Sequence, residues 1–384
     1  MRQPTIIFSG MVAADPGQGG ASWAVLQYVL GLHRLGYDVH LIEPIGQAAI
    51  RPSGFSLHHS DNAAYFRNVV ASSGLQDRCS LLLQASRETV GESYAQLAAA
   101  ASRADVLINV SGMLDRPELT DRIPIRVYLD LDPAFNQLWH SAQNIDMRLD
   151  GHTHFVTVGQ ALGSERCLIP TCGRQWTHTL PPITLEHYST DNTIIHDAFT
   201  TIGNWRGYGS IDHDGVFYGQ KAHSLRPLID LPQRSPEQFI LALTIHPEET
   251  KDLEALSRNG WKLLDPTEVA GTPRKYMDFI KGSKAELGIA KSGYVASRCG
   301  WVSDRSACYL AFGRPVIAQD TGFGAYLPNG EGLFGFQTTD DILTAVEAIT
   351  ADYKRQSRAA HSIAHEYFDA GKVLPRLLAS VGAA

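Results

Sequence analysis

Residues 5–42 contain a strand, a glycine-rich loop, a helix and a second strand, and this order is the strongest constraint on the fold. Residues 5–8 are β-branched or aromatic, as in a buried strand, and the loop over 15–20 follows them. Apolar residues then recur at helical spacing, with Ser22 placed to cap the helix and Gly36 placed to end it. Another strand is predicted at 39–42. The segment is therefore predicted to form a right-handed βαβ unit, which builds parallel sheets.

The same alternation continues along the first half of the chain. A helix is predicted over residues 92–103, and buried strands are predicted at 106–110, 125–129 and 154–158. Several strands buried on both faces indicate a parallel sheet covered by helices. A proline-containing polar stretch over 180–193 then interrupts the pattern and is predicted to be a linker.

After this stretch the α/β pattern begins again and ends in a helical segment over 340–379. The predicted strands of the second half lie at 199–202, 239–243, 261–264, 286–290 and 315–318. Two α/β units of similar size predict two Rossmann-like domains that face each other, with a ligand in the cleft between them. The expected division is an N-terminal domain over 1–190, a C-terminal domain over 191–360, and a final helix over 361–384 that packs back on the N-terminal domain.

The amino-acid composition limits which classes of partner and which compartment we expect for this protein. Hydrophobic residues make up 44% of the 384 residues, which is enough for a large core, and the net charge of −7 argues against nucleic acid as a partner. The five cysteines show no CxxC spacing, so neither a disulfide framework nor a zinc knuckle is indicated. No stretch reaches the roughly 18 apolar residues of a membrane span. We therefore expect a cytoplasmic protein.

Residues 291–318 carry the most specific pattern in the chain. Ser303, Asp304, Arg305 and Ser306 occupy a predicted helix start, where free N–H groups, hydroxyls and a guanidinium can meet phosphate oxygens. Arg298 lies just upstream and adds a second cation. Taken alone, the same residues favour an ordinary helix start that Ser303 or Asp304 caps, with Arg305 in solvent; the flanking Gly-Trp and Gly-Arg-Pro sequences favour the phosphate site.

This stretch resembles the donor-binding segment of GT-B glycosyltransferases. Plant-type members carry His-Cys-Gly-Trp-Asn-Ser where this chain has Arg298-Cys299-Gly300-Trp301-Val302-Ser303, and both continue to a Gly-x-Pro-Val run. Near the N-terminus, Gly19-Gly20 and the later Leu35-Gly36-Tyr37 resemble the opening of glycosyltransferase family 4. The resemblance covers residues 19–42 and 282–350, and it implies an α/β protein of the GT-B fold.

The resemblance also implies a nucleotide-sugar co-substrate, with no bound metal and no further cofactor. The residues that it assigns to the donor are Gly19, Gly20, Arg206, Lys221, Arg298, Gly300, Ser303, Asp304, Arg305, Ser306, Asp320, Thr321, Gly322 and Phe323. For the glycine pair and for the turn over 320–323, a tight turn without any ligand is the competing interpretation.

Two departures from the family patterns leave the stereochemical outcome open. The paired glutamates of retaining family 4 enzymes correspond to Gly300 and Cys308 here, and the plant-type histidine is also absent. An inverting enzyme would need a general base near the acceptor hydroxyl. The candidates are Asp15, Asp130 and Asp132, each of which is also typical of a turn or a helix cap.

No metal site is expected, because the histidine pairs at 58–59 and 152/154 lack partners at ligand spacing. The sequence Asp130-Leu131-Asp132 has the form of an Asp-x-Asp metal motif and is the main argument to the contrary. The predicted function is transfer of a sugar from a nucleotide sugar to a small-molecule or carbohydrate acceptor. The alternatives are a nucleotide-sugar epimerase or hydrolase of the same fold, or a catalytically silent module that binds a nucleotide sugar.

Overall fold

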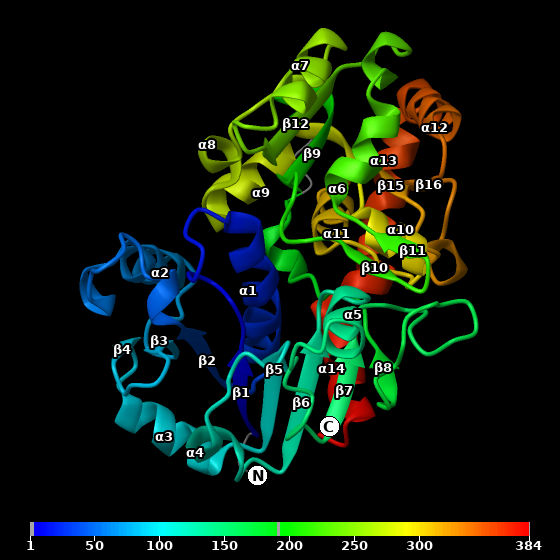
Figure 1. The fold of residues 1–384 in the computed structure, drawn as a ribbon. Helices are drawn as coiled ribbons and strands as arrows, with labels where there is room; N and C mark the ends of the chain where they lie inside the picture. The colour runs from blue at the N-terminus through cyan, green and yellow to red at the C-terminus, as the bar shows by residue number, and fades with distance from the viewer. Residues whose placement is uncertain (1–3, 190–192, 384) are drawn as a thin grey trace.

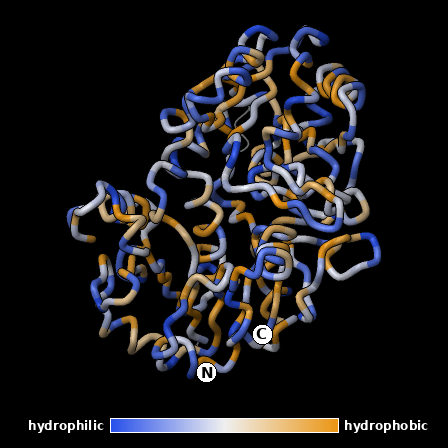
Figure 2. Tube along the Cα trace, in the orientation of Figure 1, coloured by the Kyte–Doolittle hydropathy of each residue, from blue (hydrophilic) through white to orange (hydrophobic). Residues whose placement is uncertain are grey.

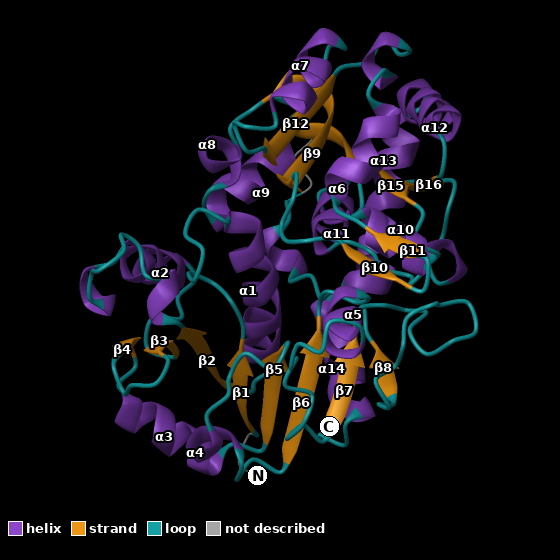
Figure 3. Ribbon diagram, viewed as in Figure 1, coloured by secondary structure: helices purple, strands orange, loops and turns teal. Residues whose placement is uncertain are grey.

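The computed structural model describes residues 4–189 and 193–383, and it contains two parallel β-sheets, each flanked by helices (Figures 1 and 3). The first sheet has the order β4-β3-β2-β1-β5-β6-β7-β8, and only β4 runs antiparallel to its neighbour. Its strands are β1 (Thr5–Ser9), β2 (Asp38–Ile45), β3 (Cys79–Leu83), β4 (Thr89–Gly91), β5 (Val106–Val110), β6 (Ile125–Asp130), β7 (His154–Thr157) and β8 (Trp176–His178).

The second sheet has the order β13-β12-β9-β14-β15-β16 and is parallel throughout. Its strands are β9 (His196–Asn204), β12 (Phe239–Thr244), β13 (Lys262–Leu263), β14 (Ser283–Gly288), β15 (Val316–Gln319) and β16 (Leu333–Phe336). A separate hairpin is formed by β10 (Ile211–His213) and β11 (Val216–Tyr218).

Helices connect most of the parallel strands, since the crossover between two parallel strands is usually a helix. In the first half they are α1 (Gly19–Arg34), α2 (Asp61–Ser72), α3 (Tyr94–Arg103), α4 (Pro117–Thr120) and α5 (Phe135–Ser141). In the second half they are α6 (Lys221–Leu225), α7 (Thr250–Arg258), α8 (Pro266–Ala270), α9 (Pro273–Gly282), α10 (Ser292–Ser297), α11 (Asp304–Ala311), α12 (Thr339–Ala351) and α13 (Tyr353–Ile363). A π-helical turn (Ala364–Phe368) leads into α14 (Ala370–Ser380). Of the helices in the described ranges, none is long and apolar enough to cross a membrane.

The predicted strands are confirmed, with shifts of a few residues at their ends. Gly36 follows the last turn of α1 with φ +91°, as its predicted role at the helix end requires. The predicted role of Ser22 as a cap is wrong, because α1 begins earlier, at Gly19, and the Ser22 hydroxyl donates to the Val12 carbonyl at 2.7 Å. The predicted helix over 92–103 begins at Tyr94, where Ser93 and Gln96 form a capping box.

The predicted linker over 180–193 is partly built into the fold. The Ile183 backbone exchanges hydrogen bonds of 2.7 and 2.9 Å with Phe368 and Ala370, so this segment pairs with the entry to α14. Thr184 and Tyr188 are buried. The predicted boundary between residues 190 and 191 lies outside the described residues.

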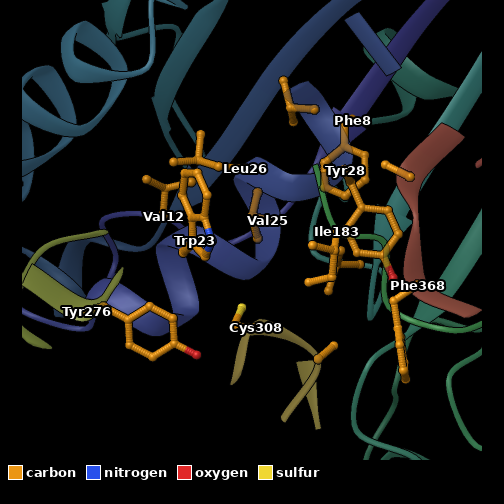
Figure 4. Close-up of a cluster of buried hydrophobic side chains, with 14 of the residues drawn as sticks. Phe8, Val12, Trp23, Val25, Leu26, Tyr28, Ile183, Tyr276, Cys308 and Phe368 are labelled. Carbon is orange, nitrogen blue, oxygen red and sulfur yellow. The ribbon is translucent and has the colours of Figure 1, made fainter. Parts of the chain in front are cut away.

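One hydrophobic core extends across both halves of the molecule. Figure 4 shows its members from α1, such as Tyr28, together with Cys308 of α11, Tyr276 of α9 and Ile183. Helix α1 packs against α9 and α11 of the second half and against α14, and it lies between the two sheets in Figure 1. Apolar segments concentrate in the strands of both sheets (Figure 2). The two halves are therefore joined by buried apolar surface along one side of the space between the sheets.

Candidate functional site

A cavity of about 420 Å³ lies where the carboxyl ends of the two sheets face each other. Met11, Val110 and Leu131 line it at or just beyond the ends of β1, β5 and β6. From the second half, Gly203 and Asn204 at the end of β9 and Thr244 at the end of β12 line the opposite side, with Lys291 beyond β14. Open α/β sheets bind their ligands at this edge. The cavity is therefore the candidate site.

Gly19 and Gly20 line this cavity and also allow the two halves to approach closely. A Cβ atom on Gly19 would lie 2.3 Å from the carbonyl carbon and oxygen of Thr272, and one on Gly20 would lie 2.9 Å from the Tyr276 ring. The pair therefore explains how the first turn of α1 packs against the α8–α9 segment. The same packing brings the N-terminus of α1, with its free N–H groups, to the cavity wall.

The start of α11 forms another part of the wall. Ser303 caps this helix by accepting a hydrogen bond of 3.2 Å from the backbone N–H of Arg305, and Ser303, Asp304 and Arg305 all line the cavity. Burial raises the pKa of the Asp304 carboxyl. Ser306 is buried within the helix and does not line the cavity. Two helix N-termini, those of α1 and α11, thus border one cavity.

Arg305 is held by groups of the second sheet. Its Nε donates to Oε1 of the fully buried Glu286 at 2.5 Å, and its Nη1 donates to the Ile202 carbonyl at 2.9 Å. Burial lowers the pKa of Arg305, but the combined attraction of Glu286, Tyr276 and Tyr309 outweighs burial and raises this pKa above its ordinary value. Nearby Lys221 is buried and donates to the Ile289 carbonyl, and burial together with the repulsion of Arg305 lowers the pKa of its ammonium. Lys221 lies behind the wall and does not line the cavity.

The other donor residues predicted from the sequence lie elsewhere. Arg206 pairs with Glu249 away from the cavity. Arg298, Asp320 and Gly322 line a separate hollow of about 180 Å³. Gly300, Thr321 and Phe323 do not line the cavity either. Gly300 donates to the Thr321 carbonyl at 2.8 Å, and the Thr321 hydroxyl donates to the Trp301 carbonyl at 2.6 Å. Phe323 is part of the hydrophobic core.

None of the three candidate bases lines the cavity. Asp15 is exposed and lies in the loop that carries Gly17. Asp130 is fully buried, and its carboxylate accepts hydrogen bonds of 2.7–2.8 Å from Asn136, Gln137 and Thr157. Burial raises the pKa of Asp130 to about 6, against the effect of those hydrogen bonds.

Asp132 is bound into a cluster that joins the two halves. Its carboxylate receives the Lys291 ammonium at 3.0 Å and the Tyr208 hydroxyl at 2.5 Å, and Tyr294 donates to its other oxygen. Lys291 and the two tyrosines belong to the second half, whereas Asp132 follows β6 of the first. We call Asp132, Tyr208, Lys291 and Tyr294 the interdomain cluster.

The sequence analysis missed Lys291 and several uncharged wall residues. Lys291 comes directly after the predicted strand over 286–290, so the rule that drew attention to Asp130 and Asp132 applies to it equally. Thr244 and Tyr276 carry no motif, because only the tertiary arrangement brings them to the wall. In the part of the chain that the structure describes, no group of three or more His, Cys, Asp or Glu side chains is arranged to hold a metal ion.

No family model and no curated protein matches this sequence. Solved structures match over almost the whole chain. An α-glucosyltransferase in complex with UDP-glucose and DNA containing an abasic site is 11% identical, with a TM-score of 0.62 over 98% of each chain. HepE of Anabaena in complex with UDP-glucose is 13% identical, with a TM-score of 0.59 over 99% of this chain and 100% of HepE. The sucrose-phosphate synthase of Thermosynechococcus elongatus is 12% identical, with a TM-score of 0.55 over the full length of both chains.

These likenesses and the two facing parallel sheets define the fold. The chain has the GT-B glycosyltransferase fold, as the sequence analysis expected. The resemblance of the N-terminal loop to family 4 in particular stays a prediction.

Proposed function

We propose that this protein is a glycosyltransferase that binds a nucleotide sugar in the cavity between the two halves and transfers the sugar to an acceptor. The observation that carries the proposal is the cavity itself, with carboxyl ends of both sheets and the N-termini of α1 and α11 on its wall. Helix N-termini favour phosphate groups because their free N–H groups and dipoles attract anions. The likeness to proteins bound to UDP-glucose is an argument from the fold, and it points to the same ligand class.

We propose that the two halves of the chain bind different substrates, as expected from the sequence. Residues 191–360 would hold most of the nucleotide, residues 1–190 would present the acceptor, and residues 361–384 would tie the chain back to the first half. The packing of α14 against α1 supports the last point. We propose no metal requirement, because helix N-termini and Lys291 are available to offset the charge of the leaving diphosphate.

The proposed acceptor is a small molecule or a carbohydrate. One structural neighbour is in complex with DNA, but the net charge of −7 here does not favour phosphate backbones. All five cysteines are free thiols, which fits the reducing cytoplasm in which we place the protein.

Calorimetric titration tests the proposal. Each common nucleoside diphosphate is titrated into the wild type and into Ala24→Trp, which fills the cavity from α1, with the exposed Ala48→Trp as the control. We expect one nucleoside diphosphate to bind the wild type and Ala48→Trp alike and to bind Ala24→Trp at least tenfold more weakly. Absence of binding to the wild type would refute the proposal.

A turnover assay separates transfer from its alternatives. Radiolabelled nucleotide sugar is incubated with and without a panel of sugar acceptors, in the presence and absence of EDTA. We expect label to move to an acceptor and EDTA to have no effect. Isomerised or hydrolysed donor without an acceptor would instead indicate an epimerase or a hydrolase.

A further inference from the structure

Lys291 is the lining residue of the cavity whose positive charge is best placed to bind an anionic ligand. Among the described residues that line the cavity, Lys291 and Arg305 carry positive charge, and the charge of Arg305 is offset by Glu286 at 2.5 Å. We propose that Lys291 binds the diphosphate of the donor and that its bond to Asp132 couples this contact to the opposite half of the molecule. The inference rests on the proposed function, because it assumes a nucleoside diphosphate in the cavity.

The interdomain cluster fixes the position of the Lys291 ammonium. Its Nζ lies 3.0 and 3.2 Å from the two carboxylate oxygens of Asp132 and 3.3 Å from the Tyr294 hydroxyl, and it also donates to Tyr208. Three aromatic rings surround it, with their centres 4.1 Å (Tyr208), 5.0 Å (Phe135) and 5.1 Å (Tyr294) away. The side chain is nevertheless 24% exposed, and it lines the cavity.

The aromatic rings favour a charged lysine without occupying its hydrogen-bond donors. A cation over an aromatic face is stabilised by the ring quadrupole. Burial lowers the pKa of Lys291, and the adjacent Asp132 carboxylate acts in the opposite direction. The arrangement therefore keeps an ammonium at a wall that is otherwise largely apolar.

The cluster can release one donor of Lys291 without leaving Asp132 unpaired. The hydroxyls of Tyr208 and Tyr294 both donate to the Asp132 carboxylate, one to each oxygen. A phosphate oxygen in the cavity can therefore take an N–H of Lys291 while two hydroxyls still satisfy Asp132. A partly buried carboxylate that lost all its partners would oppose such an exchange.

The exchange gives the cluster a role in coupling the two halves. Without a ligand, Asp132 and Lys291 attract each other directly across the space between the sheets. With a diphosphate present, the ammonium is shared between the ligand and Asp132. Donor binding then changes the hydrogen bonds of Asp132 at the end of β6, in the half of the molecule that we assign to the acceptor.

Calorimetry with a nucleoside diphosphate and its parent nucleoside tests the assignment. The pair used is the one that binds the wild type in the screen above. We expect Lys291→Met to weaken diphosphate binding by about 10- to 100-fold, as for the loss of a hydrogen bond to a charged group, and to change nucleoside binding less than twofold. Lys291→Arg, which keeps the charge, should recover part of the affinity.

Lys284→Met is the matched control. Lys284 also pairs with a carboxylate, at 2.6 Å from Glu237, and lies over an aromatic ring, with Phe199 at 5.8 Å, but it does not line the cavity. It should leave both affinities unchanged. Equal weakening of diphosphate and nucleoside binding by Lys291→Met, or no weakening, would overturn the proposal.

Asp132→Asn keeps the proposal testable if Lys291→Met does not fold. Loss of the carboxylate frees the ammonium, so diphosphate affinity should rise, and a fall would overturn the inference. If no nucleoside diphosphate binds the wild type, the proposed function fails and the role of Lys291 fails with it. If the wild type binds and Lys291→Met binds equally well, only the role of Lys291 fails.

Discussion

Replacement of Gly19 by alanine should disturb the contact between the two halves at the cavity. The new Cβ would lie 2.3 Å from the carbonyl carbon and oxygen of Thr272 and 2.4 Å from the Ala270 oxygen. Non-bonded atoms prefer separations of about 3.5–4.0 Å, so α1 and the α8–α9 segment must move apart by about 1 Å. The obstacles are backbone atoms, which cannot rotate away as a side chain could.

The expected cost follows from two opposing contributions. Overpacking of a close contact costs about 1–3 kcal/mol, and replacing glycine by alanine in a helix recovers at most about 1 kcal/mol. We therefore expect Gly19→Ala to lower the free energy of unfolding by about 1–2 kcal/mol in urea denaturation. We also expect weaker nucleotide binding, because Gly19 is part of the cavity wall.

Gly209→Ala is the control for Gly19→Ala. No atom lies within 4 Å of a Cβ at Gly209, and the residue is exposed, so stability and binding should stay at the wild-type level. If Gly19→Ala matched the wild type in both assays, the close approach described here would not exist in solution. The reasoning from backbone contact would then be refuted.

Three further predictions concern buried polar groups. Arg305→Ala should destabilise the fold by about 3–5 kcal/mol in urea denaturation, because Glu286 would lose its counter-charge, and Arg305→Ala/Glu286→Leu should recover part of this loss. Burial raises the pKa of Glu43 to about 7, above its ordinary value of 4.5. Between about pH 5 and 7 the folded state therefore binds more protons than the unfolded state, so the free energy of unfolding should fall as pH rises through this range. Glu43→Gln should reduce this pH dependence in denaturation curves. The Tyr28 hydroxyl is buried without a hydrogen-bond partner in the described structure, so Tyr28→Phe should leave the melting temperature unchanged or raise it, and a clear decrease would indicate a bound partner.

Local patterns were sufficient to predict the architecture. The strand–loop–helix–strand order near the N-terminus and its repetition after residue 193 required only periodicity and turn chemistry. The strand β3, Cys79–Leu83, was missed because a short apolar run without clear flanking signals does not distinguish strand from helix. Ser22 was misplaced as a cap because a serine inside the first turns satisfies its hydroxyl with a nearby carbonyl equally well.

The site was only partly predictable, since it depends on contacts between distant segments. The start of α11 was predicted from its own residues, and Ser303 is its cap. The pairing of Asp132 with Lys291 joins positions 159 residues apart, and the partnership of Arg305 with Glu286 depends on how α11 packs on β14. Single-sequence patterns do not contain such pairings.

The return of the chain to its starting half affects how the protein can be made. Helix α14 buries Leu374 and Leu378 and packs against α1, with the Leu374 side chain 2.5 Å from the position of a Cβ on Gly31. Part of the core of the first half is therefore synthesised only after the whole second sheet. During translation the first sheet emerges early, yet the face of α1 that carries Gly31 stays uncovered by α14 until that helix leaves the ribosome. The order of synthesis thus leaves an apolar helix face exposed for most of translation, and the last helix ends that exposure.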